Sequence, residues 1–449
     1  MGAAHLSHGV VMNHARTTVL LLACACAVTS FAAEPARGFI ADSSAQLLLR
    51  NSYFNRSKED GRRDARDWTQ GVLGQFNSGF TEGTLGVGVD AFAYLGLKLD
   101  APADKSGTGN LPVHDDGEPA DSYGKAGAAL KLRLSNSVLK YGEQRPETPV
   151  FGVSHFRIVP QTATGLALVS REVEALEVQA GHFTSGTSPV TTNGDGDLWA
   201  VMAGVSTPTA DYLGGTYQLT PGLSATLYGS RFKDIWNQYY ANLDARIDLD
   251  PHHQLGLGLM AYRTLDEGRA KAGAINNTSL GLSTFWRSGG HRWLLGLQKI
   301  DGDTPFDYLG VGDKDRHGRN GNDQGASILL PNAAQFADFN GPRERSWQLR
   351  YDLALATYGV PGLSFMSRYV RGWGIDGSHI AASSPYAGRY GDNGQHHEIN
   401  LELRYVVQSG PAKGLSVRAR QAWHRADRDQ GSGDLDDFRL ITDYPIDIL

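Results

Sequence analysis

Residues 397–408 read HEINLELRYVVQ, a run in which apolar and polar side chains alternate almost without exception. The apolar set is Ile399, Leu401, Leu403, Tyr405 and Val407, and the polar set is Glu398, Asn400, Glu402 and Arg404. Successive side chains of a strand point to opposite faces, so this period of two predicts a strand with one apolar and one wet face. The same pattern recurs in residues 85–99, 129–135 and 438–444.

The connections between such segments alternate between short and long. Short turns are expected near residues 78–83, 135–137, 174–176, 220–222, 249–253, 288–291, 358–363 and 409–415. Nine longer loops fall between these turns and include residues 301–344 and 372–396. Short periplasmic turns at one rim and long extracellular loops at the other are typical of a bacterial outer-membrane barrel. We therefore predict an all-β fold, an 18-stranded antiparallel transmembrane β-barrel wide enough to hold an aqueous channel.

The N-terminus has the features of an export signal. Arg16 precedes an apolar run at residues 19–28, and small residues at 30–33 suit a cleavage site. The run is too short to span a bilayer as a helix. We predict a signal peptide at residues 1–33, with Met12 as an alternative start, and a barrel domain at residues 34–449. Together with the turn pattern, this predicts the outer membrane of a Gram-negative bacterium.

Composition narrows the remaining classes of function. The net charge of −6 argues against general nucleic-acid binding. Both cysteines, Cys24 and Cys26, lie in the apolar leader, so residues 34–449 offer no disulfide or thiolate metal site. The pairs at residues 252–253 and 396–397 are adjacent histidines, which point to opposite faces of a strand and so chelate poorly. We expect no metal site and no cofactor. A soluble all-β protein has the same periodicity, and only the export signal and the turn asymmetry argue against it.

Basic side chains recur on the polar faces of the expected strands. They are Arg50, Arg56, Lys131, Arg133, Arg418, Arg420 and Arg439. Fixed cations along a narrow channel lower the barrier for a carboxylate, and the planar guanidinium binds carboxylate at two points. We interpret the set as a basic ladder in the lumen. The alternative is that they are ordinary charges on a wetted wall.

Longer segments resemble the OprD-type substrate-specific outer-membrane porins over nearly all of residues 34–449. The matching segments are residues 38–40, 47–51, 54–56, 67–71, 88–91, 272–273, 302–308, 338–342, 405–411 and 420–425. The resemblance implies a monomeric barrel with an inward-folded loop that passes small carboxylate-bearing nutrients by facilitated diffusion. It is strongest to the branch associated with basic amino acids, small peptides and carbapenem entry. The implied partners are outer-membrane lipid, lipopolysaccharide, small carboxylate solutes and the outer-membrane assembly machinery.

The resemblance also implies particular site residues. Arg56, Arg418, Arg420 and Arg439 match members of the family's basic ladder. Residues 145–165 resemble its inward-folded loop, in which Arg157 matches an arginine of the constriction and Asp338 an acid facing it. Such a pair would orient a zwitterion, whereas the alternative role for Arg157 is a salt bridge that anchors the loop.

This sequence departs from its relatives at the same constriction. Met202 and Phe336 stand where the relatives carry tyrosine, and Ala333 where they carry serine. A site that discriminates by hydrogen bonding loses selectivity when hydroxyls are lost. The substrate branch therefore stays open, with an aromatic carboxylate channel as one alternative.

Two other classes of function are alternatives to a channel. A peptidase activity proposed within the family implies a triad at His182, Asp234 and Ser327. No nucleophile elbow or oxyanion signal surrounds these residues, so we do not expect an enzyme. A non-conducting adhesin is the third hypothesis, but an adhesin has no need of a basic lumen.

Overall fold

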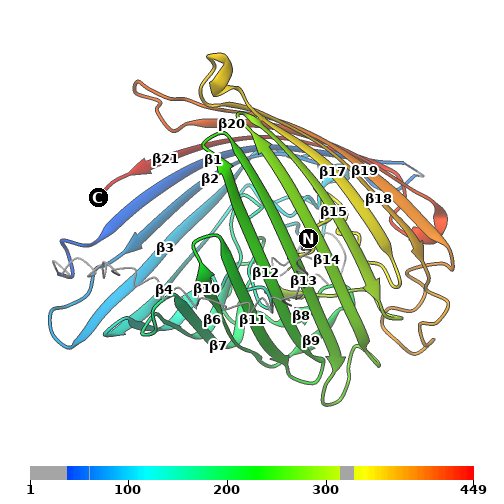
Figure 1. The fold of residues 1–449 in the computed structure, drawn as a ribbon, viewed down its shortest axis with the longest axis horizontal. Coiled ribbons are helices and arrows are strands. Elements are labelled where there is room, and N and C mark those ends of the chain that lie inside the picture. Colours follow the sequence, from blue (N-terminus) through cyan, green and yellow to red (C-terminus); the bar gives the residue numbers. More distant parts are fainter. Residues whose placement is uncertain (1–37, 60, 314–327) are drawn as a thin grey trace, which may run out of the picture. The chain divides into compact units, whose positions relative to one another are not determined.

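The barrel is formed by a single closed sheet of 18 antiparallel strands. A computed structural model describes residues 38–59, 61–313 and 328–449. The barrel strands are β1 (Ser44–Lys58), β2 (Ala65–Asn77), β3 (Leu85–Asp100), β4 (Ser122–Leu134), β5 (Ser137–Gln144), β6 (Thr162–Ser170), β7 (Leu176–Thr187), β10 (Ala210–Thr220), β11 (Leu223–Phe232), β12 (Trp236–Asp250), β13 (His253–Asp266), β14 (Asn276–Ser288), β15 (His291–Asp301), β17 (Arg345–Ala354), β18 (Leu363–Ile375), β19 (Gly394–Val406), β20 (Ser416–Ala426) and β21 (Leu435–Asp447). Each strand pairs with its neighbours along the chain, and β1 pairs with both β2 and β21, which closes the ring (Figure 1). The predicted 18-stranded barrel is confirmed.

The alternating pattern places apolar side chains on the outside. In β19, Leu401 and Leu403 are exposed, whereas Glu398 and Asn400 are fully buried inside the ring. A soluble sandwich would show the opposite arrangement, because its apolar faces point inward. The described residues contain no helix long and apolar enough to cross a membrane.

All eight predicted short turns join consecutive strands, but some connections at the opposite rim are as short, and the shortest has three residues. Residues 233–235 link β11 to β12, where a longer loop was expected. The tight turn is possible because Asp234 adopts a left-handed backbone with φ of 66°. The Glu267 carboxylate accepts its backbone N–H at 2.7 Å. The prediction of nine long loops was therefore wrong at this position.

Among the described residues, at least three segments fold into the barrel, where one was expected. The first is the loop at residues 145–161; β6 begins at residue 162, so the predicted segment 145–165 was too long at its end. The other two contain β8 (Leu198–Ala200), β9 (Val205–Thr207) and β16 (Leu309–Val311), which form a separate three-stranded sheet. Phe151 of the first segment packs on Phe183 and Phe232, with ring centroids 5.1 and 6.3 Å away. Apolar packing thus fills the side of the lumen that faces β7 to β15.

The loop at residues 145–161 also reaches the opposite wall. Arg50 of β1 donates hydrogen bonds to the carbonyl oxygens of His155 and Arg157, each at 3.1 Å. Ile158 is fully buried against β2, where a Cβ on Gly71 would lie 2.8 Å from its Cγ1 atom. The loop therefore spans the lumen and narrows it, and Gly71 provides the space in which it rests.

We expect Gly71→Val to displace the inner loop and enlarge the pore. The new side chain cannot fit beside Ile158 and its carbonyl oxygen, 3.0 Å from the Cβ position. Single-channel conductance of the variant in planar bilayers should rise, while heat-modifiable mobility shows that the barrel is intact. Gly74→Val on the same strand is the control, because the nearest atom to its Cβ position is 3.4 Å away. Equal conductance of parent and Gly71→Val would contradict this account of the loop.

Candidate functional site

A basic wall lines the lumen on β18, β20, β21 and β1. Arg420 and Arg439 lie directly opposite each other across β20 and β21, and Arg439 lies opposite Phe54 of β1. Like charges at directly opposed positions destabilise a sheet. Carboxylates relieve this repulsion: Asp437 pairs with Arg56 at 2.6 Å and with Arg439 at 2.7 Å, and Glu402 pairs with Arg420 at 2.8 Å. Three of the predicted ladder residues are thus brought together on this wall.

The other predicted ladder residues have different surroundings. Arg418 lies on the same inner face of β20, opposite Arg404 of β19. Arg50 pairs with Asp443 at 2.7 Å and holds the inner loop. These two residues extend the basic wall toward the rim at which β20 begins.

Lys131 and Arg133 lie on β4, away from the basic wall in the strand order. Lys131 pairs with Asp90 at 2.5 Å and donates to the carbonyl oxygen of Ser78 at 2.8 Å. Both cations also lie over the ring of Phe80, at 5.2 and 4.7 Å. Lys131 and Arg133 thus contact and stabilise the short turn between β2 and β3.

Three guanidinium groups surround the buried ring of Phe54. The Cζ atoms of Arg56, Arg157 and Arg439 lie 5.2, 5.2 and 4.9 Å from its centroid. A cation over an aromatic face is stabilised by the ring quadrupole, so the ring can hold these charges close together. Arg157 comes from the inner loop and the other two from the wall. The predicted constriction arginine is therefore placed beside the ladder.

A second segment, residues 332–338, is fixed against the same wall. The Glu398 carboxylate accepts the backbone N–H groups of Gln335, Phe336 and Ala337 at 2.9, 3.1 and 2.8 Å. Arg368 of β18 donates to the carbonyl oxygen of Ala333 at 2.9 Å. Strand alternation identified Glu398 as a polar inward residue, but nothing local indicated that it holds a distant loop. Arg368 was missed altogether.

A cavity of about 230 Å³ lies beside this segment and is lined by Met202, Phe336 and Asp338. Three of the five predicted constriction residues therefore meet there. Phe336 also lies 5.0 Å from the guanidinium of Arg56, which connects the cavity to the basic wall. Ala333 does not line the cavity and packs against the apolar cluster of the lumen.

Asp338 lies in an acidic environment. Burial, together with the neighbouring carboxylates of Glu398 and Glu344, raises the pKa of Asp338 to about 7. Arg157 has different neighbours: it lies over Phe54 and acts electrostatically on Asp67. Asp338 and Arg157 thus have different neighbours in the structure. Their action as a facing pair stays a prediction.

The three residues of the implied triad are not joined by the described contacts. His182 pairs with Asp211 at 2.5 Å, and both side chains are more than 40% exposed. Asp234 pairs with Arg269 at 2.8 Å. Ser327 lies outside the described residues. Among the described residues, His182 and Asp234 therefore bond to other partners and not to each other.

The adjacent histidines at 396 and 397 lie on opposite faces of β19. His396 is buried and bonds through its ring nitrogens to Glu344 and His424, each at 2.8 Å, while His397 is only partly buried. In the part of the chain that is described, no group of three or more His, Cys, Asp or Glu side chains is arranged to hold a metal ion.

Comparisons with known proteins agree with this architecture. The family model for outer membrane porins of the OprD family matches residues 37–448. Porin D of Pseudomonas aeruginosa is 54% identical over 417 residues, which cover 92% of this chain and 93% of that protein. The porin-like protein GalP of Pseudomonas putida is 34% identical over 421 residues, covering 92% and 94%.

Solved structures show the same likeness. A crystal structure of OprD from Pseudomonas aeruginosa matches with a TM-score of 0.79 at 48% identity and covers 92% of this chain and 98% of its own. OpdK from the same organism, solved with vanillate, matches with a TM-score of 0.79 at 34% identity, covering 91% and 100%. The closed ring, the outward apolar faces and these relatives place the protein in the outer membrane of a Gram-negative bacterium. The chain belongs to the OprD family of outer-membrane porins.

Proposed function

We propose that this porin is a selective, passive channel for small carboxylate-bearing nutrients, foremost basic amino acids and small peptides, and that carbapenem-type antibiotics can share the path. The observation that carries the proposal is the group of three guanidiniums around Phe54, next to the cavity that contains Asp338. A solute with both a carboxylate and an ammonium group finds opposite charges within one narrow section.

The charged groups of the basic wall are suited to binding a solute only briefly. Arg56 and Arg439 share the carboxylate of Asp437, so neither presents its full charge to a solute. A channel must bind its solute strongly enough to admit it and weakly enough to release it. Partly neutralised guanidiniums fulfil both requirements, since they keep free N–H donors while their net attraction is reduced.

An aromatic carboxylate is the second candidate solute. Met202 and Phe336 present apolar surface to the cavity, beside the hydroxyl-bearing Tyr308, Tyr390 and Ser432. OpdK, whose structure was solved with the aromatic carboxylate vanillate, has the same fold. A serine peptidase receives less support, because His182 and Asp234 bond to Asp211 and Arg269.

The proposal includes the setting of the channel. Residues 1–33 act as a cleaved signal peptide, the outer-membrane assembly machinery inserts the barrel, and the protein works as a monomer surrounded by lipid and lipopolysaccharide. Substrates are small solutes, and nucleic acid is not among the partners.

Uptake into reconstituted vesicles tests the proposal directly. Vesicles containing the protein would be offered lysine, arginine, dipeptides, vanillate and benzoate, alongside uncharged sugars of similar size. We expect carboxylate solutes, led by basic amino acids, to enter faster than the sugars. Sugars entering as fast as carboxylates would overturn the proposal, and vanillate leading the panel would favour the second candidate. Peptide hydrolysis that is lost in Ser327→Ala would instead establish the peptidase.

Neutralising the wall with Arg418→Gln and Arg420→Gln should slow carboxylate flux and shift ion selectivity toward cations. Removing Arg420 leaves Glu402 without its 2.8 Å partner, so the net charge of the wall becomes more negative. We expect an effect on the order of tenfold at low salt, shrinking as salt screens the field over about 8–10 Å. Arg231→Gln is the control, because this exposed side chain lies on the outer side of β11, where it pairs with Glu267. Unchanged selectivity at low salt would show that these arginines do not line the path.

Ion selectivity should also depend on pH through Asp338. Because its pKa is raised to about 7, the carboxyl is neutral in mildly acidic solution and becomes charged as the pH rises through neutrality. Reversal potentials measured from pH 6 to pH 8 should therefore shift toward cation selectivity. The Asp338→Asn variant should lose this step, and the comparison isolates Asp338 from His396, Glu344 and Arg389, which line the same cavity. Identical pH profiles for parent and variant would contradict the assignment.

Restoring hydroxyls with Met202→Tyr, Ala333→Ser and Phe336→Tyr should sharpen discrimination among amino acids. Sites that hydrogen-bond a substrate reject analogues that leave those groups unpaired, whereas apolar walls distinguish side chains only about 10- to 200-fold. The measurement is the ranking of uptake rates across the amino-acid panel. Arg157→Gln is the contrasting variant, expected to depress flux of all carboxylates with little change in ranking. If the triple variant ranked the amino acids by uptake rate as the parent does, the prediction would be wrong.

A further inference from the structure

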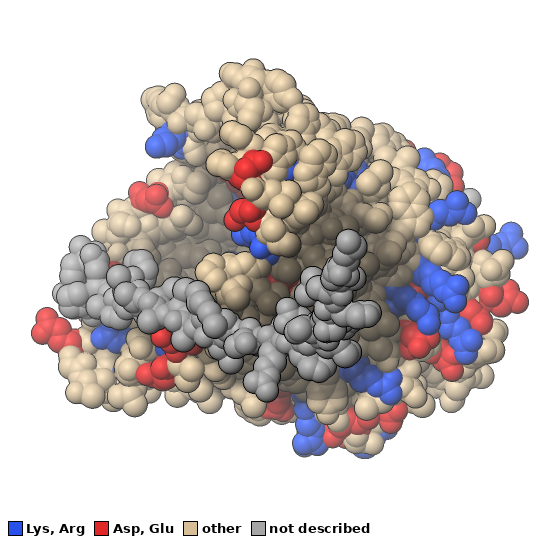
Figure 2. All heavy atoms as spheres, viewed as in Figure 1, with Lys and Arg blue, Asp and Glu red and all other residues tan. Residues whose placement is uncertain are grey.

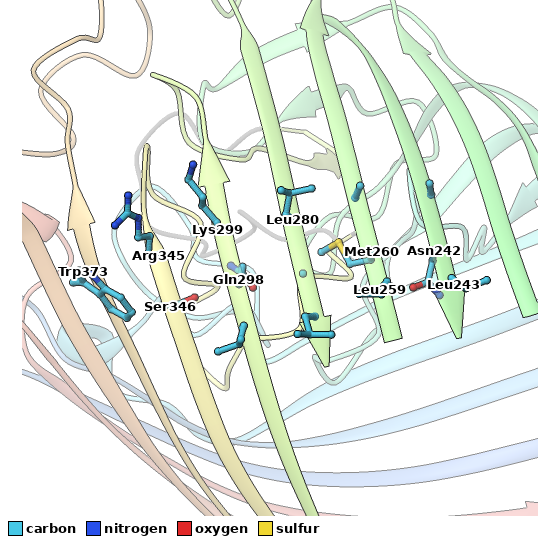
Figure 3. Close-up of a pocket in the computed structure, with 15 residues that line it drawn as sticks. Asn242, Leu243, Leu259, Met260, Leu280, Gln298, Lys299, Arg345, Ser346 and Trp373 are labelled. Carbon is cyan, nitrogen blue, oxygen red and sulfur yellow. The ribbon is translucent and has the colours of Figure 1, made fainter. Parts of the chain in front are cut away.

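The outer face of the barrel has an apolar hollow of about 750 Å³ that spans β12 to β18 (Figure 3). Its apolar wall consists of outward-facing side chains near the middle of the strands: Leu243, Leu259, Leu280, Leu282 and Leu297. Its border toward the loops consists of Lys299, Arg345 and Trp373. In Figure 3 the charged ends of Lys299 and Arg345 point the same way, on neighbouring strands, with Leu280 on the next strand beside Lys299.

A polar hollow of about 670 Å³ continues from this border and shares Lys299, Arg345 and Trp373 with it. Its other charged members are Arg263, Arg343, Asp301, Asp303, Asp376 and Asp392. Figure 2 shows Lys, Arg, Asp and Glu side chains gathered on the side where β18 and β19 meet their long loop in Figure 1. An apolar groove therefore opens directly into a charged one.

The cations at this border have an unusual arrangement. Lys299 and Arg345 are directly paired across β15 and β17, and Arg345 is directly paired with Trp373 of β18. Like charges at opposed positions repel, so an anion between them would relieve the strain. Lys299 has a carboxylate partner in Asp301 at 2.9 Å. Among the described residues, no hydrogen bond or salt bridge joins the Arg345 guanidinium to a carboxylate.

The other charged side chains of the polar hollow differ in whether a carboxylate already pairs with them. Arg263 donates to the hydroxyl of Thr278 at 2.9 Å and has no carboxylate partner in the described part of the chain. Arg343 pairs with Asp303 at 2.6 Å, and Asp376 is bonded to the hydroxyl and backbone N–H of Ser378. Arg345 and Arg263 are thus the two guanidiniums available to an incoming group.

The positions of Lys299 and Arg345 along their strands show at which depth of the membrane the two hollows meet. β15 ends at residue 301 and β17 begins at residue 345, so Lys299 and Arg345 lie at the strand ends that lead into the long extracellular loops. This is the level of the headgroups of the outer leaflet, and tryptophan and the long basic side chains favour such an interface. Leu280 is paired directly with Lys299. Leu243, Leu259, Leu282 and Leu297 are paired in one row two residues further from the strand ends, on the side of the acyl chains.

We propose that this double hollow binds a phosphorylated, multiply acylated lipid of the outer leaflet, the chemistry of the lipid A part of lipopolysaccharide. A phosphate lies between Lys299 and Arg345, within reach of Arg263, and an acyl chain follows the leucine-lined groove. Guanidinium binds phosphate in bidentate fashion, and such charge-assisted hydrogen bonds are the strong ones. The phosphate also removes the repulsion between the two paired cations.

The test measures lipid binding to the full barrel in detergent micelles by native mass spectrometry, with purified lipid A as the probe. The variant Lys299→Gln/Arg345→Gln should bind lipid A about tenfold or more weakly, because each lost charge-assisted bond contributes substantially. Lipid A freed of its phosphates should bind parent and variant equally weakly. Leu280→Trp should also weaken binding of intact lipid A, because it fills the groove without adding charge.

The control variant is Arg66→Gln, at the corresponding end of β2 and paired with Asp100 at 3.1 Å. It should bind lipid A like the parent, and every variant should keep heat-modifiable mobility and carboxylate flux, since the changes lie outside the lumen. Equal binding by parent and double variant would overturn the proposal. So would an equal loss in Arg66→Gln, or displacement of lipid A by millimolar inorganic phosphate, which would reveal a site for a free anion.

Discussion

The structure depends on one constraint: a backbone inside lipid has no water to pair with. Every N–H and C=O in that layer needs a partner, and a sheet meets this need only if it has no free edge. Pairing of β1 with both β2 and β21 removes the edge. Once the ring is closed, the two-residue period decides which side chains face lipid and which face the lumen. The basic wall and the outer groove therefore lie on opposite faces of one continuous sheet, the wall mainly on β20, β21 and β1 and the groove on β12 to β18.

The lumen itself is divided into two unlike sides. Aromatic and aliphatic packing around Phe151 holds the inner segments on the side of β7 to β15. On the other side they are held by charged groups and hydrogen bonds. Glu398 accepts hydrogen bonds from three successive N–H groups, and Arg50 donates to a carbonyl oxygen of the inner loop. A buried carboxylate with several donors is well satisfied and is costly to disturb. The inner segments are thus fixed on this side by polar contacts together with a small apolar cluster around Phe339 and Val370, while the larger apolar cluster lies across the lumen.

Much of this could be predicted from alternation and turn spacing, and the rest could not for a physical reason. The alternation of side chains along each strand was enough to predict that Arg56, Arg420 and Arg439 face the lumen. The resemblance placed Arg157, Met202, Phe336 and Asp338 at one narrow section, and the structure gathers the last three around a single cavity. Docking of residues 332–338 onto Glu398 joins positions some sixty residues apart, and no local pattern records such a contact. The same is true of Arg368, of the two further inner segments, and of the turn at residues 233–235, which depends on a carboxylate from another loop.

The pairing of β1 with β21 also sets an order of events. The two strands are paired from Gln46 with Asp447 to Lys58 with Leu435, so the last strand of the sheet in chain order closes against the first. Until it arrives, the sheet has two open edges, and open edges invite pairing with other chains. Contacts so distant along the chain form slowly because loop closure is entropically costly. A sheet without β21 would therefore leave β1 and β20 with unpaired edges in the bilayer, where every backbone group needs a partner.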